Sequence, residues 1–172
     1  MLRVGTVGTS SIMRTIQEAI RLTDGMECRV VYSRTEEQGR AFAAEMGVPE
    51  HCTDYAAMLE RSDLDLIDIA SPNRFHVEQA LAALEHGKHV IVEKPAAVTR
   101  GDVQRLIDAA RANGVYFFEA ITTLFMPQYE ACRLLLPKLG RIEQAHITYA
   151  QYSSRYDAYL RGENPNIFNP AM

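Results

Sequence analysis

The sequence predicts an α/β protein in which residues 1–120 form a doubly wound parallel sheet. Apolar segments of strand length alternate along this part of the chain with segments whose apolar residues recur at helical spacing. Glycines such as Gly47 and Gly87 end several of the helical segments. Strands separated by helices of this length pair in parallel through right-handed crossovers, which gives the doubly wound architecture. The pattern changes after Pro127, so we expect residues 121–172 to begin a second domain.

The first half of the chain repeats one unit of strand, helix and strand. The strand segments are short apolar runs, and each helical segment begins or ends at a small or polar residue. We predict strands at residues 3–7, 27–32, 51–53 and 66–70, and helices at residues 11–22, 36–46 and 54–61.

The next elements continue the alternation up to residue 120. Pro72 and Asn73 break the preceding strand and open a helix that Gly87 closes. A strand at residues 89–92 follows. Thr99 then caps another helix, with Asp102 three residues later as an acidic variant of the capping box. The apolar stripes of the two helices are Val77, Ala80, Leu81 and Leu84, and Val103, Leu106, Ile107 and Ala110. The last strand of the series is expected at residues 115–119.

Beyond the sheet, we expect a helix at residues 129–136 and then a strand. Residues 142–152 alternate roughly between apolar and polar types, which predicts the strand, whereas residues 153–172 show no period. A strand with no later strand to pair with indicates a chain that stops early in its second domain. We therefore expect a fragment of a longer protein or a truncated gene product.

Composition excludes several classes of function. Of the 172 residues, 47% are hydrophobic, which is enough for a packed core, and the net charge of −4 argues against nucleic acid or an anionic membrane surface as a partner. No apolar run approaches the length of a membrane span, and no signal peptide is visible. Three separated cysteines without a CxxC pair favour packing roles in a reducing compartment, so we expect the cytoplasm.

The turn after the first strand is the first candidate site. Gly8, Thr9, Ser10, Ser11 and Ile12 lie where the strand passes into a helix, and there backbone N–H groups and the helix dipole can hold a pyrophosphate. The sequence of this turn departs from the GxGxxG motif, because Ser10 replaces the second glycine and a methionine replaces the third. From these residues alone, the segment could equally be an ordinary strand-to-helix turn with no ligand.

The end of the second strand indicates which dinucleotide would bind. An NAD site usually has an acidic residue there to bind the ribose 2′-hydroxyl, but this chain has Ser33 and Arg34. A hydroxyl beside a guanidinium suits a 2′-phosphate, so we expect NADP, with NAD as the alternative. A solvated loop is the other interpretation of these two residues.

Two further loops follow strands at the same edge of the predicted sheet. Ser71, Asn73 and His76 follow the fourth strand, and Glu93 and Lys94 follow the fifth. Ligands of doubly wound sheets bind outside the carboxyl ends of the strands. A lone loop lysine is usually a solvated charge, and a histidine in the first turn of a helix is usually a cap or a packing residue. The loops become informative because they occur together.

The chain resembles the Gfo/Idh/MocA family, the relatives of glucose–fructose oxidoreductase and inositol dehydrogenase, over its whole length. The residues that carry the resemblance are Val7–Ser10, Tyr32–Arg34, Ala70–His76 and Gly87–Pro95. Residues 118–127 also resemble the dihydrodiol dehydrogenase branch.

The resemblance implies a Rossmann domain at residues 1–120, followed by the start of an α+β substrate and dimerisation domain at residues 121–172. It implies a nicotinamide-dependent oxidoreductase that acts on a sugar, polyol or related diol and is a homo-oligomer when full length. Lys94 would be the catalytic residue that touches substrate and would also contact the cofactor. Asn73, His76 and Glu93 would lie near the nicotinamide. Second-domain groups of the family would be expected just where this sequence ends, near residues 168–172.

Two other functions stay open at this point. A dinucleotide-binding or redox-sensing module without turnover would use the same first domain. A sugar-binding or scaffold protein could also share the fold, because a fold does not determine a function.

Overall fold

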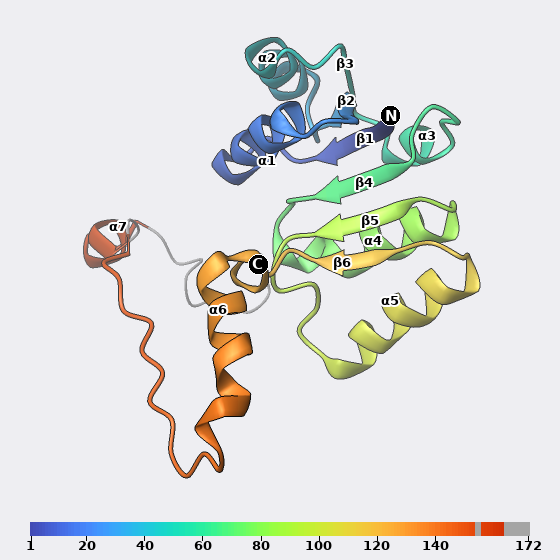
Figure 1. The fold of residues 1–172 in the computed structure, drawn as a ribbon. Helices are drawn as coiled ribbons and strands as arrows, with labels where there is room; N and C mark the ends of the chain where they lie inside the picture. Colours follow the sequence, from blue (N-terminus) through green and yellow to red (C-terminus); the bar gives the residue numbers. More distant parts are fainter. Residues whose placement is uncertain (154–155, 164–172) are drawn as a thin grey trace. The chain divides into compact units, whose positions relative to one another are not determined.

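The computed structural model describes residues 1–153 and 156–163. The chain divides into two units, Met1–Ala120 and Ile121–Met172, and each is described by itself. Figure 1 shows the sheet of the first unit with its helices, and the helices of the second unit in orange and red. No helix in the described ranges is both long enough and apolar enough to cross a membrane.

The first unit is built on a six-stranded sheet whose strand pairs are all parallel, in the order β3-β2-β1-β4-β5-β6. The strands are β1 Leu2–Val7, β2 Met26–Tyr32, β3 Glu50–Cys52, β4 Leu66–Ile69, β5 His89–Val92 and β6 Phe117–Glu119. The chain runs outward from β1 to β3 and then returns to β4 on the other side of β1. This reversal opens a crevice at the carboxyl ends of β1 and β4, the usual ligand position in such sheets.

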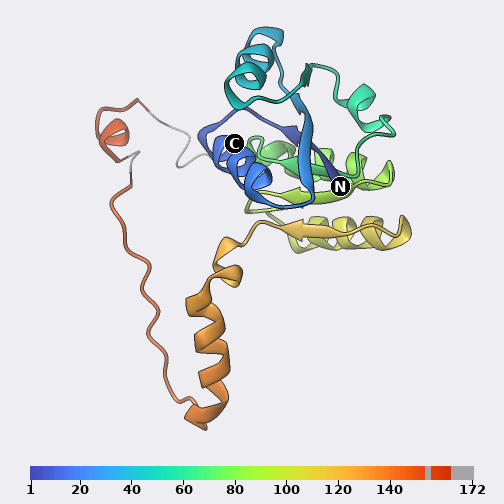
Figure 2. The ribbon, with the colours of Figure 1, turned by 45° about the horizontal axis from the view of Figure 1, so that its top comes forward.

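Helices cover both faces of the sheet. They are α1 Ser11–Leu22, α2 Glu36–Met46, α3 Tyr55–Leu59, α4 His76–Glu85 and α5 Arg100–Ala112, with a 3-10 turn at Asn73–Phe75 before α4. Helices α1 and α2 lie on one face, and α4 and α5 lie on the other (Figure 1 and Figure 2). The predicted doubly wound α/β fold is therefore confirmed.

Successive side chains of each strand point to opposite faces of the sheet, so apolar strands build one apolar layer on each face. Ile67 and Ile69 of β4 pack with residues of α3, α4 and α5, whereas Leu66 packs with Ile20 of α1. Met13 of α1 is fully buried and packs in a neighbouring cluster with Phe42 of α2. The methionine that replaces the third motif glycine thus fills the layer between α1, α2 and the sheet.

Local capping signals set the helix starts. The Thr99 hydroxyl accepts a hydrogen bond from the Asp102 backbone N–H at 3.1 Å and donates to the Asp102 carboxylate at 2.7 Å. Thr35 and Asp54 cap α2 and α3 in the same way by accepting backbone N–H groups. Each of the three caps accepts one of the backbone N–H groups that a helix start leaves without an intrahelical partner.

The second unit contains the 3-10 turns Thr122–Phe125 and Leu136–Leu139, and the helices α6 Pro127–Leu135 and α7 Tyr156–Leu160. The strand expected at residues 142–152 is absent from the described ranges, so that prediction was wrong, and Ile147 is 93% exposed. Alternation of apolar and polar residues is not sufficient for a strand, because the backbone N–H and C=O groups of a strand must form hydrogen bonds with a neighbouring strand. Helix α7 also corrects the expectation of an unpatterned tail. Residues 168–172 lie outside the described ranges.

Candidate functional site

A glycine brings three strand ends together at the switch point of the sheet. Gly8 has φ +116°, and a Cβ at this position would lie 2.8 Å from the Ala70 carbonyl oxygen. The Gly8 N–H donates to the Tyr32 carbonyl oxygen at 3.0 Å. The turn after β1 therefore passes directly beside the ends of β2 and β4, and only glycine allows this approach without strain.

The first turn of α1 follows this glycine. Ser10 is the N-cap residue, but its side chain makes no capping hydrogen bond, and the first turn contains no acidic residue. Ser10, Ser11 and Ile12 are exposed. The N–H groups at this helix start have no side-chain cap, and the positive end of the helix dipole favours an anion there.

A pocket of about 340 Å³ lies at the carboxyl ends of β1, β2 and β4. Its lining includes six residues that the sequence proposed: Gly8, Thr9, Ser10, Ser33, Arg34 and Ser71. Of the other lining residues, Tyr32 and Phe75 lie in segments that carry the family resemblance but were not proposed as site residues, and Gln38 and Gln79 were missed. A position at the end of β2 could have indicated Tyr32, but no local signal marks Gln38 or Gln79.

The β2 end of the pocket carries a free cation. Arg34 is exposed and forms no ion pair with any residue in the described ranges. Ser33 beside it is buried, and its hydroxyl oxygen accepts the Thr35 N–H at 3.4 Å. None of the described residues that line the pocket is acidic. The nearby Glu36 is held by hydrogen bonds from His51 and Arg40, which lower the pKa of its carboxyl.

The β4 side of the pocket is held by a small network. The Ser71 hydroxyl donates to the Gln79 side-chain oxygen at 2.6 Å, and the Tyr55 hydroxyl donates to the Gln79 carbonyl oxygen at 2.8 Å. Because the Ser71 proton is engaged by Gln79, its oxygen is left to accept a hydrogen bond from a ligand.

The remaining proposed residues, which include Ser11 and Ile12 in the first turn of α1, lie outside the lining of this pocket. Asn73 is exposed in the 3-10 turn before α4. Glu93 is half-buried and Lys94 is exposed, and the Lys94–Pro95 peptide bond is cis. The Lys94 ammonium forms no ion pair among residues 1–153 and 156–163. His76 is fully buried between the loops that follow β4 and β5.

A buried acid that sequence reasoning missed lies on β4. Asp68 is 6% exposed, and its Oδ1 atom has no hydrogen-bond partner in the part of the chain that the structure describes. Burial and the charge of Glu93 raise the pKa of this carboxyl to about 7. Asp68 of β4 is in register with Ile91 of β5, and Glu93 is the first residue after the end of β5.

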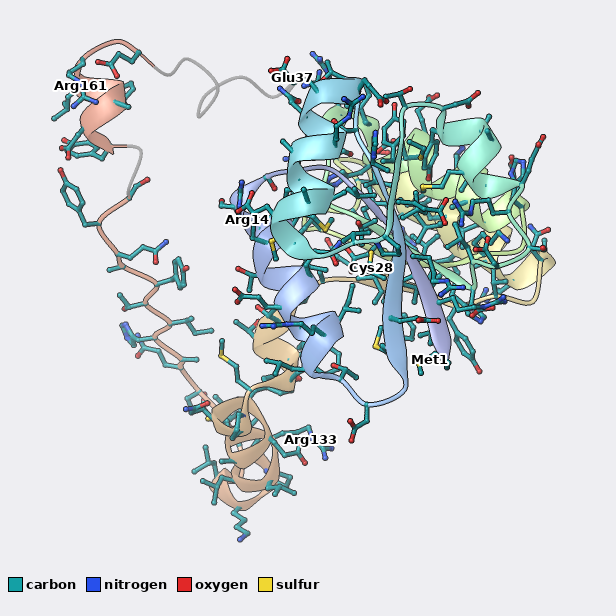
Figure 3. The ribbon with its side chains drawn as sticks, turned by 90° about the horizontal axis from the view of Figure 1, so that it is seen from above. Met1, Arg14, Cys28, Glu37, Arg133 and Arg161 are labelled. Atoms are coloured by element: carbon teal, nitrogen blue, oxygen red, sulfur yellow. The ribbon has the colours of Figure 1, made fainter. Side chains whose placement is uncertain are left out.

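The cysteines do not contribute a nucleophile to the pocket, as no cysteine of the described ranges lines it. Figure 3 shows Cys28 among the side chains inside the first unit. Burial raises the pKa of the Cys28 thiol, which disfavours the thiolate.

Comparison with known proteins agrees with this geometry. The model of the Gfo/Idh/MocA family, described as "Oxidoreductase family, NAD-binding Rossmann fold", matches residues 2–121. The chain is 42% identical over 172 residues to the uncharacterized oxidoreductase YgjR of Escherichia coli (strain K12). It is 37% identical over 172 residues to scyllo-inositol 2-dehydrogenase (NADP(+)) IolU of Bacillus subtilis (strain 168). Both matches cover 100% of this chain and 52% of the relative, so the chain spans about half the length of these curated relatives.

Solved structures show the same fold. KijD10, a 3-ketoreductase from Actinomadura kijaniata in complex with NADP and TDP-benzene, matches with a TM-score of 0.74 and 30% sequence identity. The match covers 80% of this chain and 42% of that chain. The family model covers well over half of the sequence, and the resemblance that the motifs predicted is confirmed. The chain belongs to the Gfo/Idh/MocA family of oxidoreductases, which has an NAD-binding Rossmann fold.

Proposed function

We propose that the protein that carries this chain is an NADP-dependent oxidoreductase that transfers a hydride between the nicotinamide cofactor and a sugar, polyol or related diol. The observation that carries the proposal is the pocket at the switch point of the sheet. It combines the Gly8 turn, the start of α1 and the free Arg34 guanidinium, and it has no acidic residue in its described lining.

The residues present fit a dinucleotide phosphate. The N–H groups from Gly8 to Ile12 would hold the pyrophosphate, because Gly8 leaves room for close approach and the start of α1 lacks an acidic side chain. Ser33 and Arg34 would hold the 2′-phosphate, since a guanidinium offers a planar fork of donors. NAD would lack the carboxylate that usually binds its ribose 2′-hydroxyl.

The loops after β4 and β5 would form the nicotinamide side. Ser71 can accept a hydrogen bond, and Asn73 and Glu93 lie in loops at the same edge of the sheet. The cofactor supplies the hydride chemistry when it is bound. The chain contributes Lys94, whose ammonium would stabilise negative charge on the substrate oxygen or exchange its proton.

The substrate class is supported by relatives and not by the pocket. IolU is a scyllo-inositol 2-dehydrogenase by name, and KijD10 is described as a 3-ketoreductase. Carbinol and carbonyl groups of polyols and sugars would suit a lysine that handles charge on oxygen. In this proposal residues 1–120 bind the dinucleotide, and residues 121–172 begin the substrate domain.

Cofactor preference is tested by titrating NADPH and NADH with the wild-type chain and with Arg34→Ala, with nicotinamide fluorescence as the signal. A lost charged contact is worth about 1.5 to 3 kcal/mol, so the variant should bind NADPH roughly ten- to a hundredfold more weakly and NADH almost unchanged. Arg111→Ala, in the last turn of α5, removes the same charge away from the pocket and should change neither affinity. Equal affinities for both cofactors, or equal losses in Arg34→Ala, would contradict the proposal.

The role of Lys94 is tested in the protein made from the natural gene, including any residues encoded after position 172. Lys94→Met should slow single-turnover hydride transfer by about 10²- to 10³-fold, the usual cost of losing a group that stabilises an oxyanion. The Kd for NADPH should stay within about twofold, because Lys94 does not line the phosphate pocket. Hydride transfer within a few-fold of wild type would reduce Lys94 to a solvated loop lysine.

A further inference from the structure

The turn that carries Lys94 is held by two side chains from different elements. His76, the first residue of α4, places its Nδ1 2.9 Å from the Pro95 carbonyl oxygen. Glu119, the last residue of β6, accepts the Ala96 N–H at 2.8 Å through its Oε1. The sequence separations are 19 and 23 residues, so both contacts depend on the folded sheet. His76 and Glu119 therefore contact the backbone of Pro95 and Ala96, the two residues that follow Lys94.

The His76 ring also reaches the loop after β4. Its Nε2 lies 2.8 Å from the Ser71 carbonyl oxygen, and the side chain is 0% exposed. Carbonyl oxygens only accept hydrogen bonds, so each contact needs a proton on the facing ring nitrogen. A neutral ring donates at one nitrogen, and a doubly protonated ring donates at both. Both ring nitrogens therefore face carbonyl oxygens of the protein, and neither is free to contact a ligand.

Glu119 provides a hydrogen-bond acceptor for the backbone N–H of Ala96, at the other side of the turn. Ala96 is 2% exposed, and a buried backbone N–H without a partner costs free energy. The carboxylate of Glu119 supplies the acceptor and makes the hydrogen bond charge-assisted. Since β6 pairs with β5 at Val92 and Glu119, the acceptor comes from the strand next to the one that ends before the turn.

We propose that His76 and Glu119 are positioning residues that fix the Lys94–Ala96 turn, His76 by donating from Nδ1 to the Pro95 carbonyl and Glu119 by accepting the Ala96 N–H. The inference rests on the proposed function in one respect, because it gives Lys94 a defined place from which to act on substrate. It assigns His76 a contact with the loop that follows Lys94, in place of the cofactor contact that the family resemblance implies.

A matched pair of variants at the exposed Glu119 tests the second contact. In the 172-residue chain, Glu119→Ala should speed amide hydrogen exchange of Ala96 by about tenfold or more, because the N–H loses its acceptor. Glu119→Gln keeps an acceptor oxygen at the same position and should change exchange by less than about threefold. Unchanged exchange in Glu119→Ala would overturn this contact. NMR detection reports the single amide.

Two variants at His76 separate its two contacts. The side-chain nitrogen of asparagine matches Nδ1 of histidine in its distance along the side chain, and that of glutamine matches Nε2. His76→Asn should therefore keep the wild-type amide shifts of Lys94 and Ala96, and His76→Gln should lose them. The ring ¹⁵N shifts of the wild-type chain should show a proton on Nδ1. An unprotonated Nδ1 would overturn the His76 contact even where the buried variants fail to fold.

The same measurements distinguish this inference from the proposed function. Ala96 exchange and the His76 ring shifts need no cofactor or substrate. If the wild-type chain fails to bind NADPH while Glu119→Ala still speeds Ala96 exchange, the proposed function fails and the positioning holds. If NADPH binds and Ala96 exchange is unchanged, only the positioning fails. In the natural gene product, Glu119→Ala should lower kcat about tenfold or more, with little change in the Kd for NADPH, and Glu119→Gln should restore it.

Discussion

Replacing Asp68 with asparagine should make the chain more stable at neutral pH. Asp68 is 6% exposed, and its Oδ1 has no partner in the described ranges. Burial and the charge of Glu93 raise the pKa of the Asp68 carboxyl from 3.8 to about 7. Asp68→Asn keeps the shape of the side chain and removes the need to bury a charge.

The magnitude follows from the two pKa values. As the pH rises above about 4, the carboxyl of the unfolded chain loses its proton while the folded chain still holds it. Wild-type stability should therefore fall, relative to Asp68→Asn, between about pH 4 and pH 7, and then level off. A pKa raised by about three units corresponds to about 4 kcal/mol at 1.36 kcal/mol per unit.

Urea denaturation of both proteins at several pH values between 4 and 8 measures this difference. Asp65→Asn is the matched control of opposite sign, because hydrogen bonds from Arg3 hold the pKa of the Asp65 carboxyl well below its usual range. In measurements extended down to about pH 2, the wild type should lose stability relative to that variant as the pH falls below the ordinary aspartate pKa of 3.8. A constant difference between wild type and Asp68→Asn from pH 4 to pH 8 would refute the reasoning.

Three further outcomes are expected. Gly8→Ala should destabilise the chain more than Gly25→Ala in urea denaturation, because both glycines have positive φ but only Gly8 lacks room for a Cβ; equal losses would contradict this. Lys88→Met should cost about 1 to 3 kcal/mol, since its buried ammonium donates to two backbone carbonyls, whereas the exposed Lys138→Met should be neutral. Hydrogen exchange should be slow in the strands of residues 2–119 and rapid at residues 142–153; protection of residues 142–153 would contradict this.

The local sequence pattern was sufficient to predict the architecture of the first unit. The run Leu66–Ile69 is buried on both faces, as expected for a central parallel strand, and the Thr99 cap starts α5 where the sequence placed it. In the second unit, the alternation at residues 142–152 led to a wrong strand prediction. A strand also needs a neighbouring strand to pair with, and residues 142–152 have none in the described ranges.

The candidate site was predictable where it is local. Gly8 and Arg34 stand directly at the ends of β1 and β2, so chain order alone places them at one edge of the sheet. Gln79 and Glu119 act through contacts made by the fold, and Asp68 interrupts an otherwise apolar strand. No local spacing encodes such contacts.

Mapping NADPH on the ¹⁵N-labelled 172-residue chain by amide chemical shifts tests the central claim most directly. The account predicts that the largest shifts occur at Gly8–Ile12 and at Ser33 and Arg34, the residues proposed for the two phosphate positions. NADH should produce much smaller changes at Arg34 at the same concentration, because it lacks the 2′-phosphate. Shifts confined to other regions such as α5, or no shifts at millimolar NADPH, would contradict the claim that this pocket binds a phosphorylated dinucleotide.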